Sequence, residues 1–287
     1  MAKTPEEGFQ TLLGRLTPTM TESIAAVSHR ASIEASLKTN HGMTSFFRSG
    51  SYGFGTSISR YSDVDYFAVF PANRLHTSST DSLNTIANTF QNRFPQSGVH
   101  VDAPAIVIPF GTSRAERHEI IPVHEIGATS MGRKIYGMPD RGGGWMRASP
   151  DASVAWINSA DAKLSGKVKP LIRFAKAWKY YNSVPIRSFY LELRTVQFAI
   201  TQNTILYRYD MRSLLAALSE SLLNISEPET ANVVYPCYHH EIGTVKTAAT
   251  IALGWATNAI SEEGAGRIPQ AFNSWDRAFA GQFPGYY

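Results

Sequence analysis

The sequence predicts an α+β fold of two lobes, in which a mixed β-sheet is followed by a bundle of helices, with a cleft between them. Short runs of β-branched and aromatic residues, typical of buried strands, are confined to the first half of the chain. These runs are residues 63–70, 99–110 and 119–123. From Pro150 onward, apolar residues recur at helical spacing. A glycine run at residues 142–144 separates the two patterns, so we expect lobes at residues 1–150 and 151–287.

The first lobe begins with a helical segment at residues 5–38, which we expect to break near Thr17-Pro18-Thr19. A second helix is predicted at residues 79–94, where Ser79 or Thr80 can cap the first turn. A polar turn at residues 111–116 joins the last two predicted strands. The apolar residues that define the N-terminal segment are Leu12, Leu13, Leu16, Met20, Ile24, Val27 and Ile33.

The second lobe is predicted to be helical throughout, with breaks near residues 166, 182–185, 227–236 and 264–269. In its helix at residues 168–181, a turn of about 100° per residue places Lys169, Arg173 and Lys176 in one stripe, opposite an apolar face. The helix contains no acidic residue that could neutralise them. The stripe is therefore either a solvated basic face or a phosphate clamp. Lys179 lies about 80° off the stripe, so its loss should matter less.

The composition is that of a soluble globular protein that acts on small molecules. The formal net charge is +4, and residues 1–150 carry 14 Lys and Arg against 12 Asp and Glu, while residues 151–287 carry 13 against 11. Because proteins that hold long nucleic acid usually have a basic stripe across the domain, we expect no such partner. The single cysteine, Cys237, excludes an intrachain disulfide. Since the sequence has no apolar run of 18 residues and no signal-peptide core, we expect a cytoplasmic protein without a membrane partner.

One motif carries most of the functional information. A Gly50-Ser51 turn precedes Asp63-Val64-Asp65, which opens the first strand. Because side chains alternate along a strand, Asp63 and Asp65 project from the same side. Two carboxylates on one face form a hard oxygen site suited to Mg²⁺. The turn offers backbone N–H groups and a hydroxyl to an anion, so the motif predicts chemistry on a nucleoside triphosphate.

This motif resembles the signature of the polymerase-β-like nucleotidyltransferases, which hold a third metal-binding carboxylate on a later strand. Glu119, in Arg117-His-Glu-Ile-Ile-Pro122, fits that role, although many relatives have Asp there. Asp102 is the rival, but Pro104 follows it closely. We prefer Glu119 on the grounds of the motif.

A second block narrows the resemblance to the bacterial cGAS/DncV-like nucleotidyltransferases (CD-NTases), and the resemblance extends from about Gly50 to about Glu192. The block comprises residues 135–150, 169–178 and 186–192. The family implies a polymerase-β-like lobe, a long N-terminal helix that spans both lobes, and a helical lobe like that of the oligoadenylate synthetases. It also implies a triphosphate site on a helical lysine and a following serine, which match Lys176 and Ser188. We add Arg173, Gly50 and Ser51 to the predicted nucleotide site.

The resemblance implies a template-independent nucleotidyltransferase that joins ATP, GTP, UTP or CTP into a cyclic di- or trinucleotide second messenger. Asp63, Asp65 and Glu119 would hold two Mg²⁺ ions, with Mn²⁺ as an alternative ion. In bacterial anti-phage signalling (CBASS), such a product activates a separate effector. The alternatives are an RNA- or protein-modifying nucleotidyltransferase, a linear oligoadenylate-type synthetase, and an inactive nucleotide-binding regulator.

The histidines do not form a metal motif. The pair His118 and His124 lacks the spacing of the His-Glu-x-x-His motif, and Pro122 between them disfavours a helix. We expect alternating strand positions or surface exposure for this pair and for His239 and His240.

Overall fold

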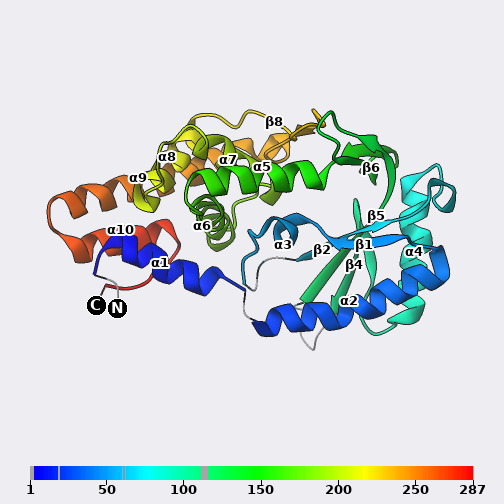
Figure 1. Cartoon of the computed structure of the whole chain (residues 1–287). Coiled ribbons are helices and arrows are strands. Elements are labelled where there is room, and N and C mark those ends of the chain that lie inside the picture. Colours follow the sequence, from blue (N-terminus) through cyan, green and yellow to red (C-terminus); the bar gives the residue numbers. More distant parts are fainter. Residues whose placement is uncertain (1–2, 19, 60, 62, 111–115, 287) are drawn as a thin grey trace.

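The computed structural model describes residues 3–18, 20–59, 61, 63–110 and 116–286. Figure 1 shows a twisted sheet beside a bundle of helices, with the short helix α3 (Gly50–Phe54) near their junction. The α+β class with a mixed sheet and a helical second lobe, predicted from the sequence, is confirmed.

Within the described residues, the sheet has seven strands, in the order β1-β2-β5-β4-β3, and β6 and β7 extend from the distal half of β5. β2 and β5 are parallel, and the other pairs are antiparallel. Buried β-branched and aromatic residues fill β2, β4 and the first half of β5, as expected for central strands. The strands are β1 (Ser45–Arg48), β2 (Val64–Val69), β3 (His100–Asp102), β4 (Ala105–Phe110), β5 (Glu116–Ala128), β6 (Lys134–Pro139) and β7 (Trp145–Ala148).

The observed strands differ from the predicted ones in several places: β1 was not predicted, and β5 is longer than the strand expected at residues 119–123. Residues 99–110, expected as one strand, form the tight hairpin β3–β4, because the chain reverses at Ala103-Pro104. β6 was not predicted because glycine and proline interrupt its apolar pattern, and β7 was not predicted because it has only four residues. Gly137 in β6 is required by close packing, because a Cβ atom there would lie 2.5 Å from the ring of His124. The polar turn predicted at residues 111–116 lies largely outside the described residues.

Helices α2 (Met20–His41) and α4 (Ser79–Arg93) cover one face of the sheet. Ile33 and Leu37 of α2 share a buried core with residues of β2, β4 and β5. The helix predicted from the apolar spacing is present, but near its start Ile24 and Val27 are 64% and 53% exposed; the side chain of Met20 lies outside those described. The N-cap of α4 is Ser78, one residue before the predicted cap, and its hydroxyl accepts from the N–H of Asp81.

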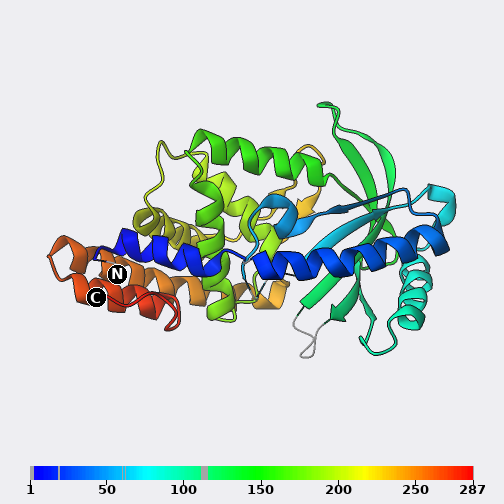
Figure 2. The ribbon, with the colours of Figure 1, turned by 60° about the horizontal axis from the view of Figure 1, so that its bottom comes forward.

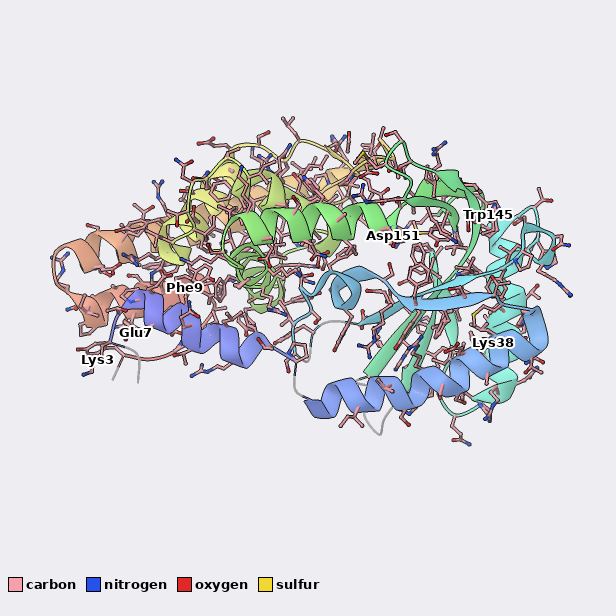
Figure 3. All side chains as sticks on the ribbon, in the orientation of Figure 1. Lys3, Glu7, Phe9, Lys38, Trp145 and Asp151 are labelled. Carbon is pink, nitrogen blue, oxygen red and sulfur yellow. The ribbon has the colours of Figure 1, made fainter. Side chains whose placement is uncertain are left out.

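The N-terminal helical segment crosses from one lobe to the other. Its first part, α1 (Pro5–Leu16), packs on the helical lobe, and α2 continues along the sheet nearly in line with it (Figure 2). Phe9 of α1, labelled in Figure 3, is fully buried. Its ring centroid lies 5.0 Å from that of Phe174 and 4.9 Å from that of Trp275. Aromatic edge-to-face contacts of this kind fix α1 to the helical lobe.

In the part of the second lobe that the structure describes, six α-helices are present, and breaks occur at the predicted places. A further break at residues 200–206 was missed, and the break at residues 227–236 contains a small hairpin, β8 (Ile225–Ser226) with β9 (Val233–Val234). None of the described helices is long and apolar enough to cross a membrane. The helices are α5 (Pro150–Lys163), α6 (Val168–Tyr181), α7 (Ser188–Ala199), α8 (Tyr207–Glu220), α9 (Ile242–Gly264) and α10 (Ile268–Ala278).

Candidate active site

The parallel pairing of β2 with β5 assembles an acidic cluster. Its register places Asp65 directly opposite Glu119, and Asp63 projects from the same side as Asp65. All three carboxylates line a cleft of about 520 Å³ that also receives residues of α6, α7 and β9. Asp102, the rival third acid, is 57% exposed on β3 and lies 3.8 Å from Arg141. The structure therefore brings Glu119, and not Asp102, to the two aspartates.

The Gly50-Ser51 turn lies directly against this cluster. Gly50 has a φ of +52°, and a Cβ atom at this position would lie only 1.9 Å from Oδ2 of Asp65. Glycine is therefore required both by backbone conformation and by close approach. The N–H of Ser49 donates to the carbonyl of Asp65 over 2.8 Å, which holds the turn in place beside the strand. Ser51 lines the cleft next to the acids.

The acidic cluster is electrostatically unfavourable without cations. Burial and the charge of Glu119 raise the pKa of Asp63 to about 6, although Arg117 opposes the shift. Burial, followed by the charges of Glu119 and Asp63, raises the pKa of Asp65 well above its ordinary value. A set of three hard carboxylate ligands that repel one another fits divalent ions such as Mg²⁺ or Mn²⁺.

Arg117 stands among the acids, and the sequence analysis missed it. Its Nε lies 3.3 Å from Oδ1 of Asp63, and its Nη2 donates to Oε1 of Glu119 over 3.0 Å. The signal was present in the sequence, because Arg117 precedes Glu119 by two residues and so projects from the same face of β5. The guanidinium partly neutralises the cluster.

Ser188 and Tyr180 line the cleft on the side of the helical lobe, and Lys179 lies behind Ser188 without lining the cleft itself. Lys179 Nζ donates to Oγ of Ser188 over 2.7 Å, and the hydroxyl of Tyr180 lies 3.2 Å from the same oxygen. Burial, followed by the charge of Lys176, lowers the pKa of Lys179 to about 8. Lys179 was expected to matter less than the basic stripe, yet it is the lysine that contacts the predicted serine.

The basic stripe of α6 is largely covered, since Lys169 and Arg173 are half-buried. Lys176 is buried, lines the base of the cleft, and forms an ion pair with Glu192 at 2.8 Å. Arg173 donates to the backbone carbonyls of Gly55 and Ser57 and is not among the residues that line the cleft. The interpretation that the stripe presents free positive charges is therefore wrong. Arg173 and Lys176 instead donate to the backbone carbonyls of residues 55–57, which follow α3.

The opposite face of β5 carries a separate polar group. Nδ1 of His29 lies 2.9 Å and Nε2 of His118 lies 2.6 Å from the same oxygen of Glu116. Although the three ligand atoms are close enough to surround an ion, Nδ1 of the buried His118 has no hydrogen-bond partner within the described part of the chain. The second hydrogen bond that usually orients a metal-binding imidazole is thus missing. Through these two contacts the group links α2 to β5.

Comparison with known proteins places this architecture in a family. Residues 3–161, more than half of the chain, match the profile of SMODS, the Second Messenger Oligonucleotide or Dinucleotide Synthetase domain. No individual curated protein gives a significant match.

Several solved structures share the fold over nearly their whole length. CdnC of Escherichia coli MS115-1 with ATP has a TM-score of 0.76 at 16% identity, and 98% of this chain and 99% of that chain are covered. The CD-NTase CdnG of Bradyrhizobium diazoefficiens with GTP has a TM-score of 0.72 at 11% identity, over 95% and 97%. GTP-bound DncV of Vibrio cholerae has a TM-score of 0.73 at 13% identity, over 96% and 94%. At these identities the likeness concerns the fold.

Proposed function

Because the chain belongs to the family of second messenger oligonucleotide or dinucleotide synthetases, we propose that it joins nucleoside triphosphates without a template into a short cyclic oligonucleotide. The observation that carries the proposal is the set Asp63, Asp65 and Glu119, held by one strand register beside Ser51 in the cleft. These acids would hold two Mg²⁺ ions, with Mn²⁺ as an alternative. When bound, the ions neutralise the reacting phosphate and lower the pKa of the attacking ribose hydroxyl.

The protein's own residues would orient the donor nucleotide. Ser51 and Ser188 face the cleft from opposite lobes, and both hydroxyls can donate to phosphate oxygens. Lys179, beside Ser188, supplies a positive charge at the same place. A triphosphate held between these groups presents its α-phosphorus to the acids, with pyrophosphate directed away toward the helical lobe. Lys176 adds positive charge from the base of the cleft.

The cleft also has room for the bases. Apolar side chains from both lobes line it and are available for stacking with a base. The polar side chains of Asn232 and Arg147 also line it and can contact the edge of a base. CdnC was solved with ATP and CdnG with GTP, and we propose these two nucleotides as the first substrates to test, followed by UTP and CTP. The product would activate a separate effector protein in bacterial anti-phage defence.

Product analysis tests the proposal. The protein is incubated with the four α-³²P-labelled nucleoside triphosphates and MgCl₂, and products are analysed by mass spectrometry before and after phosphatase treatment. We expect a short phosphatase-resistant product, release of one pyrophosphate per bond, and loss of activity in EDTA. Phosphatase-sensitive ladders would favour a linear synthetase or an RNA-tailing enzyme. Nucleotide binding without any product would favour an inactive regulator.

A further inference from the structure

Three consecutive backbone carbonyls follow α3, and all three accept hydrogen bonds from the helical lobe. Arg173 Nη2 donates to the carbonyl of Gly55 over 2.9 Å, and Arg173 Nε donates to that of Ser57 over 3.1 Å. Lys176 Nζ donates to the carbonyl of Thr56 between them over 3.2 Å. The donors come from successive turns of α6, so one face of this helix holds one short stretch of the other lobe.

A buried ion pair reinforces this attachment. Lys176 and Glu192 have side chains that are 1% and 3% exposed, and their charged atoms are 2.8 Å apart. The hydroxyl of Thr56 donates to the same oxygen of Glu192 over 2.6 Å. Because hydrogen bonds to a buried charge are stronger than those between neutral groups, this bond holds Thr56 firmly.

The contacts from the helical lobe also hold Ser51, the residue proposed to contact the triphosphate. The N–H of Thr56 donates to the carbonyl of Ser51 over 2.9 Å, so fixing Thr56 also fixes Ser51. The intervening helix α3 has five residues, too short to be stable by itself. The position of Ser51 therefore depends on contacts outside α3, on Asp65 at one end and on the helical lobe at the other.

We propose that Arg173, Thr56 and the Lys176–Glu192 ion pair are positioning residues. They hold residues 50–57, which comprise α3 and the three residues after it, in the conformation that binds the triphosphate. The inference rests on the proposed function, because it assigns the turn to phosphate binding. A turn that is ordered before the ligand arrives costs less free energy to order on binding. Removing the attachment should thus weaken nucleotide binding while leaving the acidic cluster intact. Arg173 and Lys176 of the stripe thus serve the nucleotide through the backbone of residues 55–57.

Matched variants test this role. Arg173→Met keeps the aliphatic stem but removes both donors, and Arg173→Lys restores one donor. Thr56→Val keeps the shape of a buried side chain but removes the hydroxyl, and Thr56→Ser restores it. Arg212→Met is the control. Arg212 also lies in the helical lobe and donates to a threonine, Thr257, but it takes no part in the contacts with residues 50–57 described above and does not line the cleft.

The readouts separate positioning from general stability. We expect Arg173→Met and Thr56→Val to raise the Kd for a non-hydrolysable ATP analogue about tenfold, with hydrogen exchange accelerated at the amides of Gly53 and Thr56. Arg173→Lys and Thr56→Ser should recover most of the affinity, Arg212→Met should match wild type, and Mg²⁺ binding should be unchanged in all of them. If both variants bind the analogue as wild type does, the positioning role is overturned. If wild type itself binds no nucleotide, the proposed function fails instead.

If Arg173→Met does not fold, Thr56→Val carries the test alone, since it is nearly isosteric with the native residue. A rise in Kd that is accompanied by equal acceleration of exchange across the whole helical lobe would also overturn the proposal, because the turn would then have no special dependence on these contacts.

Discussion

Glu119 lies directly opposite Asp65 in the parallel pairing of β5 with β2. This relationship decides which acid completes the cluster, because cross-strand neighbours on one face are the closest side chains that a sheet provides. It also explains why the pKa of Asp65 is raised: burial is the largest cause, and the charge of Glu119 is the next.

Glu119→Gln is expected to abolish nucleotide joining, because the amide cannot supply the third negative charge that two divalent ions require. Pyrophosphate release from ATP and GTP measures the loss, which should exceed 100-fold. Asp102→Asn is the matched control and should retain activity, since Asp102 lies outside the cleft. The reverse pattern would identify Asp102 as the third acid.

The double variant Asp63→Ala with Asp65→Ala should be folded and inactive. Because the two carboxylates repel each other, their removal should not lower the melting temperature of the metal-free protein at pH 7.5. Circular dichroism and a labelled-nucleotide assay check the two parts. Nucleotide incorporation by a folded double variant would contradict the active-site assignment.

The stability of the metal-free protein should fall as the pH rises from about 4 to about 6.5. Asp63 has a pKa of about 6 in the folded protein against about 3.9 when unfolded, so the folded state binds more protons in this range and the stabilisation is lost as they leave. The loss should be about 1 kcal/mol, reduced by solvent screening because Asp63 is 39% exposed.

Urea unfolding at several pH values measures this dependence, and Asp63→Asn should flatten it. Addition of Mg²⁺ should raise the melting temperature more at pH 7.5 than at pH 5, because protonated acids bind metal poorly. Equal metal-induced shifts at the two pH values would mean that the cluster is not the metal site.

We expect Lys179 to make the affinity for nucleotide depend on pH in a higher range. Since its pKa in the free protein is about 8, the side chain is increasingly neutral above pH 8 and must take up a proton when it binds phosphate. The Kd for ATP should therefore rise above pH 8, by up to about tenfold per pH unit. Calorimetry in buffers of different ionisation enthalpy measures the accompanying proton uptake.

Lys179→Arg provides the control, because arginine stays charged throughout this range; its Kd should change little between pH 7 and pH 9.5. Lys179→Met should bind weakly at every pH. A wild-type Kd that is constant across this interval would remove Lys179 from the phosphate site.

Arg117→Gln should bind Mg²⁺ on the order of tenfold more tightly than wild type in the absence of nucleotide. The wild-type guanidinium already neutralises Asp63 and Glu119 and opposes the approach of another cation. Titration followed by thermal unfolding measures the affinity, and Arg117→Lys, which keeps the charge, should resemble wild type. No gain in affinity in Arg117→Gln would show that Arg117 does not compete with the metal.

The sequence specified the acidic cluster better than its surroundings. Strand alternation alone places Asp63 and Asp65 together, and the family pattern favours Glu119 over Asp102. The register that decides between these two acids depends on which strands pair, which no local pattern encodes. The site assignments themselves stay predictions until variants are measured.

The basic stripe shows a second limit. Helical periodicity correctly grouped Arg173 with Lys176 on one face of α6, but it could not say what that face would meet. The orientation of α6 depends on tertiary packing, which turns the face toward residues 55–57 and brings Lys179 to Ser188 instead. The spacing of residues along a helix predicts which side chains share a face, whereas the segment that this face contacts is determined by the tertiary fold.

The attachment of α1 has a consequence for dissecting the protein into fragments. Phe9 and Leu12 belong to the core of the helical lobe, although they precede the whole sheet in the chain. A fragment that begins at residue 151 would therefore lack part of its own interior and would expose Phe174 and Trp275 to water. Complementation in trans by a synthetic peptide of residues 3–18 should restore its solubility, whereas the same peptide with Phe9→Ala should fail.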